Sequence, residues 1–146
     1  MFTIMLLTEE YRRRLRDFFK EKDEVILVYI FGSQVKGNLS SLSDVDIAIY
    51  LDEKLNKKDR FNLRLRLIVK VCGILGCRRV DLVVLNDAPL RLYYNIIKEG
   101  IVLYSRDELK RIRSEAKIMS KYLDQKYYQD RHNKILLDQI KKEGIL

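Results

Sequence analysis

Residue types that crosslink a fold or hold a structural metal are scarce in this chain of 146 residues. It has two cysteines, Cys72 and Cys77, and a single histidine, His132, which lies far from them in the sequence. Because a structural zinc site needs about four Cys or His ligands, we interpret both cysteines as reduced, mostly buried thiols. Hydrophobic residues make up 47% of the chain. At this length they suffice for a core without disulfides or metals.

Long apolar runs and flexible compositions are also missing. No stretch approaches the roughly 20 apolar residues of a membrane-spanning helix, and residues 1–7 lack the basic start and cleavage site of a signal peptide. One proline and six glycines are far from the composition of disordered or collagen-like chains. These absences predict one folded domain over residues 1–146, located in the cytoplasm and without a membrane partner.

Positive charge exceeds negative charge: 29 Lys and Arg stand against 21 Asp and Glu, which gives a net charge of +8. A basic balance favours an anionic partner, such as nucleic acid, a nucleotide or an acidic protein surface. The alternative is a surface laced with salt bridges, as heat-tolerant organisms use. Because the cations are spread along the chain, we expect any nucleic-acid binding to be weak and salt-dependent.

Hydrophobic spacing and the positions of Gly and Pro predict the order helix, strand, strand, helix, strand, helix, strand, helix. The helices are expected to begin near Thr8, at residue 57, at Pro89 and near Arg106, and the strands to cover 25–31, 44–51, 80–85 and 101–104. The loop between the first two strands is too short for a crossover helix, so these strands should be antiparallel. The fold class is therefore α/β (or α+β), a small mixed β-sheet flanked by helices, with a core of about 25–104 and a helical extension of about 106–146.

Apolar residues recur at helical spacing in two of these segments. The helix over 57–75 has Phe61, Leu65, Ile68, Cys72 and Leu75, with Gly76 placed to end it. The C-terminal helix has Leu109, Ile112, Ala116, Met119 and Leu123, and Ile135, Leu136 and Ile140 either continue it or form another helix.

Residues 31–50 carry the chemistry that the sequence predicts. Gly32 and Ser33 end a buried strand, and after ten residues Asp44 and Asp46 begin the next one. Residues two apart in a strand point to the same face, so both carboxylates should project together, while Val45 and Ile47 should project to the core. Two adjacent like charges call for a cation, and a pair of oxygen ligands suits Mg²⁺ bound with phosphates.

A third carboxylate, Asp81, stands at the head of the strand predicted over 80–85. A neighbouring strand would bring it beside Asp44 and Asp46, and three carboxylates at strand ends form a two-metal site for phosphoryl transfer. Gly32 allows a backbone to approach a ligand closely, and Ser33 offers hydroxyl and N–H groups to phosphate oxygens.

The combination of Gly-Ser, ten residues, Asp-x-Asp and a later Asp in VDLVVL resembles the DNA polymerase beta-like nucleotidyltransferase superfamily. The small size is similar to its minimal nucleotidyltransferase (MNT) branch. This resemblance covers residues 25–104 and implies a nucleotidyltransferase fold with Mg²⁺ as cofactor and ATP as substrate. It implies that Gly32 and Ser33 hold the phosphates, that Asp44 and Asp46 bind metal, and that Asp81 binds metal and activates the attacking hydroxyl. Lys36 is either a phosphate contact or a solvated loop lysine.

The same resemblance implies a partner. MNT proteins are typically paired with HEPN proteins in toxin/antitoxin modules, in which the MNT antitoxin transfers AMP from ATP to a tyrosine of the HEPN RNase toxin. Nothing in the residues themselves specifies this acceptor. The alternatives are nucleotide transfer to an RNA 3′ end or a small hydroxylated molecule, and an antitoxin that acts by binding alone.

Three tyrosines in the C-terminal segment, Tyr122, Tyr127 and Tyr128, lie among charged residues. Such a set forms either a protein-binding face or a helix face packed on its own domain. After Tyr104 about 40 residues remain, too few for a second domain, so a partner should hold most of the acceptor.

Overall fold

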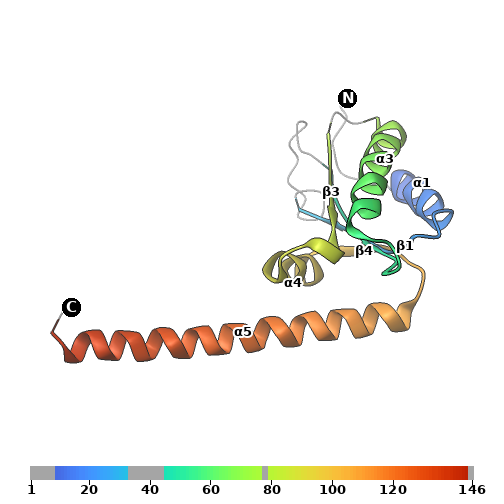
Figure 1. The fold of residues 1–146 in the computed structure, drawn as a ribbon. Coiled ribbons are helices and arrows are strands. Elements are labelled where there is room, and N and C mark those ends of the chain that lie inside the picture. Colours follow the sequence, from blue (N-terminus) through green and yellow to red (C-terminus); the bar gives the residue numbers. More distant parts are fainter. Residues whose placement is uncertain (1–8, 33–44, 77–78, 145–146) are drawn as a thin grey trace.

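The computed structural model describes residues 9–32, 45–76 and 79–144 (Figure 1). Its elements follow the predicted order, with a short 3₁₀ helix, η1, added after the third strand. That strand ends at Val84, one residue earlier than predicted, because Leu85 already belongs to η1. The bounds are α1 Glu9–Lys20, β1 Val25–Phe31, β2 Val45–Leu51, α3 Lys57–Leu75, β3 Val80–Val84, η1 Leu85–Asp87, α4 Leu90–Glu99, β4 Ile101–Ser105 and α5 Glu108–Lys142.

The four strands form one mixed sheet in the order β3-β2-β1-β4. β1 pairs antiparallel with both β2 and β4, which confirms the predicted antiparallel pairing of the first two strands. β3 lies parallel to β2 at the edge, so the chain crosses over through α3 to reach it. The mixed sheet flanked by helices is therefore confirmed.

Helices cover both faces of the sheet (Figure 1). On one face α1 and α3 pack on a hydrophobic core that includes Phe19, Ile30 and Ile47. On the other face α4 packs on a smaller core around Tyr29, Ala48 and Ile96, with the first half of α5 beside it. β1 and β2 are consequently apolar on both sides, which explains their nearly continuous hydrophobic sequences.

The buried face of α3 differs from the face that the sequence predicted. Leu63, Leu67 and Val71 are buried, whereas Phe61 and Leu65 are about half exposed. The bounds of the helix were nevertheless predicted correctly. The Asn56 side chain accepts a hydrogen bond from the Asp59 backbone N–H, and Gly76 ends the helix at a φ of +60°.

Arg106 fixes the junction between β4 and α5. Its guanidinium donates hydrogen bonds to the carbonyl oxygens of Val25, Lys20 and Lys22, at 3.1, 3.0 and 2.9 Å. The Lys20 carbonyl belongs to the last turn of α1, where carbonyl groups lack helical partners and attract a cation. One side chain thus ties the end of α1 and the start of β1 to the beginning of α5.

α5 is a single helix of 35 residues, so Ile135, Leu136 and Ile140 continue it and do not form another. None of its residues is buried. Neither α5 nor any other helix in residues 9–32, 45–76 and 79–144 has a stretch long and apolar enough to cross a membrane.

Candidate functional site

Asp46 and Asp81 are direct neighbours on adjacent strands. Asp46 of β2 is the register partner of Asp81 in the parallel pair of β2 and β3. Paired residues share a face, and adjacent strands lie about 4.8 Å apart, so the two carboxylates stand side by side. The flanking residues Val45 and Ile47 are buried in the core under α1 and α3, as predicted, and Asp46 therefore lies on the opposite face. Asp46 is half-buried and Asp81 is exposed.

Gly32 lies directly against the Asp46 carboxylate. Phe31, the last residue of β1, is the register partner of Asp46, and Gly32 follows it with a φ of +78°. A Cβ atom placed on Gly32 would lie 2.1 Å from Asp46 Oδ2 and 3.0 Å from its Cγ. Glycine is therefore required here for two reasons: the backbone is left-handed, and no space remains for a side chain.

Three of the predicted site residues, Ser33, Lys36 and Asp44, lie outside the residues that the structure describes. Within the described ranges, no three His, Cys, Asp or Glu side chains gather closely enough to hold a metal ion. Asp46 and Asp81 thus supply two carboxylates of the three predicted. Two adjacent carboxylates are hard oxygen donors, and this donor set fits Mg²⁺.

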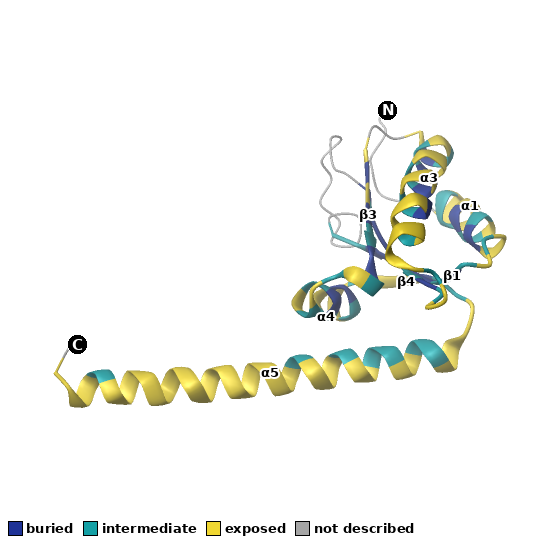
Figure 2. Cartoon of the chain, in the orientation of Figure 1, coloured by how far each residue is buried: buried dark blue, intermediate teal, exposed yellow. Residues whose placement is uncertain are grey.

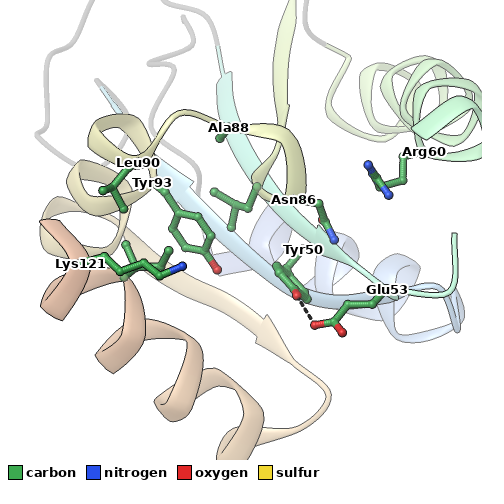
Figure 3. A pocket seen from close by; sticks show the side chains of 10 residues that line it. Tyr50, Glu53, Arg60, Asn86, Ala88, Leu90, Tyr93 and Lys121 are labelled. Carbon is green, nitrogen blue, oxygen red and sulfur yellow. Dashed lines mark hydrogen bonds between the residues drawn. The ribbon is translucent and has the colours of Figure 1, made fainter. Parts of the chain in front are cut away.

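A cavity of about 510 Å³ opens on the same face of the sheet as Asp46, between the far end of β2, α4 and α5 (Figure 3). Tyr50 lines it and lies four residues beyond Asp46, which corresponds to about 13 Å along a strand. Sequence reasoning missed this cavity. The alternation of Asp46, Ala48 and Tyr50 placed Tyr50 on this face, but the lining residues Tyr93 and Lys121 come from distant helices.

Three tyrosine hydroxyls on this face of the sheet differ in their hydrogen bonds. The Tyr50 hydroxyl donates to Glu53 at 2.6 Å, as Figure 3 shows, and the Tyr29 hydroxyl donates to Glu115 at 2.5 Å. In both tyrosines burial is the main cause of a raised pKa, and the carboxylate adds to it. The Tyr93 hydroxyl is buried and has no hydrogen-bond partner among the described residues, and burial raises the pKa of Tyr93 to about 12. These phenols therefore remain neutral at physiological pH.

The tyrosines of the C-terminal segment differ in their surroundings. Tyr122 stacks on Tyr94 of α4, with ring centroids 3.9 Å apart and planes 10° apart, so this ring packs on its own domain. Tyr127 and Tyr128 are 59% and 69% exposed. Cys72 is a free, half-buried thiol, while Cys77 lies outside the described residues.

Several solved structures similar to this chain come from toxin-antitoxin complexes. A structure described as a toxin-antitoxin with AMP-PNP is 24% identical, with a TM-score of 0.64 over 88% of this chain and 98% of that chain. The toxin-antitoxin MntA-HepT matches at 22% identity and a TM-score of 0.63, over 91% and 99% of the two chains. A complex of tri-AMPylated Shewanella oneidensis HEPN toxin with MNT antitoxin matches at 22% and 0.62, over 90% and 98%. At these identities the likeness establishes the fold.

The family comparison goes further than the fold. A search among curated proteins found no match. The family described as "Polymerase beta, Nucleotidyltransferase" matches residues 13–109, which is more than half of the chain. The matched region contains Gly32, Asp46 and Asp81, the three residues that the sheet brings together. This chain therefore belongs to the polymerase beta nucleotidyltransferase family.

Proposed function

We propose that this chain is a Mg²⁺-dependent nucleotidyltransferase that transfers AMP from ATP to a tyrosine hydroxyl of a cognate HEPN toxin, and thereby acts as its antitoxin. The observation that carries the proposal is the pairing of Asp46 with Asp81 beside the bare Cα of Gly32. The acceptor is supported by the fold shared with a complex of tri-AMPylated HEPN toxin and MNT antitoxin. AMP-PNP in another structure of this fold supports ATP as the donor.

Each site residue has a proposed role. Asp44 and Asp46 would hold Mg²⁺, which neutralises triphosphate charge when bound. Ser33 and the Gly32 backbone would contact phosphate oxygens, together with Lys36. Gly32 contributes by having no side chain, which leaves room for the Asp46 carboxylate directly against the backbone. These are the residues that the sequence singled out for the same roles.

Asp81 would complete the metal site and accept the proton of the attacking hydroxyl. A tyrosine hydroxyl is a weak nucleophile at neutral pH and needs a base to remove its proton. Its oxygen attacks the α-phosphorus of ATP and forms a new P–O bond, while the bond from that phosphorus to the bridging oxygen breaks and pyrophosphate leaves. The exposed position of Asp81 at the sheet edge leaves it accessible to a hydroxyl from another protein.

A labelling experiment tests the proposal directly. The chain is incubated with Mg²⁺ and ATP labelled at the α-phosphate, once with the purified cognate HEPN toxin and once with RNA. Label on the toxin, dependent on Mg²⁺, is the expected result. Label on RNA would replace the protein acceptor by an RNA 3′ end, which the net charge of +8 would then explain. No label on either, with the toxin still inhibited, would mean that the antitoxin acts by binding alone.

Carboxamide variants separate the roles of the carboxylates. Asp46→Asn should weaken Mg²⁺-ATP binding as well as transfer. Asp81→Asn should leave ATP affinity within a few-fold while lowering transfer about 100-fold or more, because it loses the base but keeps the shape. Asp17→Asn, on the exposed face of α1, is the matched control and should change neither quantity. Near-normal transfer by Asp81→Asn would contradict its assignment.

The stability of the Asp46 variant adds a second readout. Removing one of two adjacent carboxylates relieves charge repulsion, so Asp46→Asn should not destabilise the metal-free protein strongly. A large loss of stability in metal-free buffer would instead identify Asp46 as a structural residue.

A further inference from the structure

The outer face of α5 carries an apolar stripe that nothing in the described part of the chain covers. We call it the outer stripe: Leu109, Ile112, Ala116, Met119 and Leu123, spaced alternately by three and four residues. The four large side chains among them are 57%, 54%, 41% and 53% exposed, respectively. Spacing of this kind is the a/d pattern by which one helix packs along another.

The opposite face of α5 makes the contacts with the rest of the domain. Ile118 packs on the core formed with α4, Glu115 accepts the hydrogen bond from Tyr29, and Tyr122 stacks on Tyr94. Figure 2 shows that most of α5 is exposed, with half-buried stretches mainly in its first half. The contacts with the domain thus use the polar and mixed face of α5, and the regular apolar repeat stays exposed.

Positive charge borders the outer stripe. Lys110, Arg113 and Lys117 flank one side of its first three turns. With Leu109 they line a cavity of about 350 Å³, to which Glu53 and Asp107 also contribute on the side of the domain. Over the whole of α5, Lys and Arg outnumber Asp and Glu ten to five. A ligand for this surface therefore needs an apolar stripe of its own with negative charge beside it.

We infer that the outer stripe docks an amphipathic helix of the acceptor protein, one whose apolar stripe is edged by Asp and Glu side chains. The inference rests on the proposed function, because it takes the AMP acceptor to be a protein. Docking there keeps the acceptor beside the catalytic domain, which raises the local concentration of its hydroxyl at the carboxylates. The surface lies on α5, outside the nucleotide site.

Two other occupants fit the surface less well. RNA would satisfy the cations, but it would leave the apolar side chains of the outer stripe without matching apolar surface. A second copy of this chain would match the apolar repeat, but it would bring the same excess of positive charge to the contact. An acid-edged helix satisfies both features.

The test uses the full chain and the purified cognate HEPN toxin. The double variant Ile112→Lys with Met119→Lys changes two exposed positions of the outer stripe and should fold normally. We expect its Kd for the toxin, by calorimetry, and its KM for the toxin in AMP transfer to rise at least about 10-fold, with kcat within about 2-fold. Val69→Lys, at a 71% exposed site on α3, is the matched control and should change neither. Reversal of charge by Arg113→Glu with Lys117→Glu should weaken binding and reduce its salt dependence.

The outcomes separate this inference from the proposed function. If the wild-type chain binds the toxin through the outer stripe but transfers no AMP, the proposed function fails and the docking surface stands. If the double variant binds the toxin and transfers AMP with unchanged Kd and KM, the docking surface is wrong and the proposed function stands. The inference is also overturned if the double variant loses only RNA binding or only self-association, with toxin binding unchanged.

Discussion

Replacing Gly32 by alanine perturbs the Asp46 carboxylate through a single added methyl group. The new Cβ would lie 2.1 Å from Asp46 Oδ2, whereas ordinary contact begins at 3.4 Å, so the oxygen must withdraw by about 1.3 Å. Displacement of a reacting or ligating group by about 1 Å can cost about 100-fold in rate. The left-handed backbone, with φ at +78°, adds strain of about 1–2 kcal/mol in the folded state. We expect Gly32→Ala to lower the rate of AMP transfer about 100-fold and the free energy of unfolding by about 1–2 kcal/mol.

Gly76 provides a control with a similar left-handed backbone. Its φ is +60°, and a Cβ placed there meets no atom of the described residues within 4 Å. Gly76→Ala should therefore lose a similar 1–2 kcal/mol or so of stability in urea unfolding, while its AMP transfer stays within about 2-fold of the wild type. Equal transfer rates for the Gly32 and Gly76 variants, measured where both are folded, would show that the bare Cα beside Asp46 has no catalytic importance.

Two further predictions concern stability. Tyr93→Phe removes a buried hydroxyl that has no partner among the described residues, so the unfolding free energy should stay unchanged or rise by up to about 1 kcal/mol. Tyr29→Phe breaks the hydrogen bond to Glu115 and should lower the unfolding free energy by about 1.5 kcal/mol. Urea unfolding measures both values, and the opposite ranking would contradict the assigned hydrogen bonds. The Arg60 guanidinium donates a hydrogen bond to Asp87 and holds the pKa of that carboxyl below its usual value. The pair therefore stabilises the folded state at pH values above the usual aspartate pKa of about 4. This stabilisation is lost as the pH falls through the lowered pKa. Asp87→Asn should therefore lower stability at neutral pH by an amount that shrinks in acid, and a constant difference from pH 2 to 7 would disprove the linkage.

The sequence was most informative where local signals and the sheet pattern agreed. The β1 strand has the predicted bounds, because a run of β-branched and aromatic residues ends at a glycine with positive φ. The adjacency of Asp46 and Asp81 was also predicted, since both residues begin strands of one sheet. Ser33, Lys36 and Asp44 stay predictions, because they lie outside the described residues.

The sequence was least informative about which face of a helix is buried. In α3 apolar residues occur around most of the circumference, so the stripe containing Phe61 was as plausible as the one containing Leu63 that packs on the sheet. In α5 the most regular apolar repeat is the one that faces away from the domain. Periodicity measures amphipathicity, and it does not distinguish a face for the core from a face for a partner.

Because α5 is long, a small rotation at its anchored end produces a large displacement at its C-terminal end. Thirty-five residues at 1.5 Å each give a helix about 52 Å long. A rotation of about 5° at the Arg106 junction would therefore move the C-terminal end by about 4.5 Å, a little less than the pitch of one helical turn. The three carbonyl groups that accept hydrogen bonds from Arg106 lie at the end of α1, in the turn after it and at the start of β1, and they thus help to set the direction of this long helix.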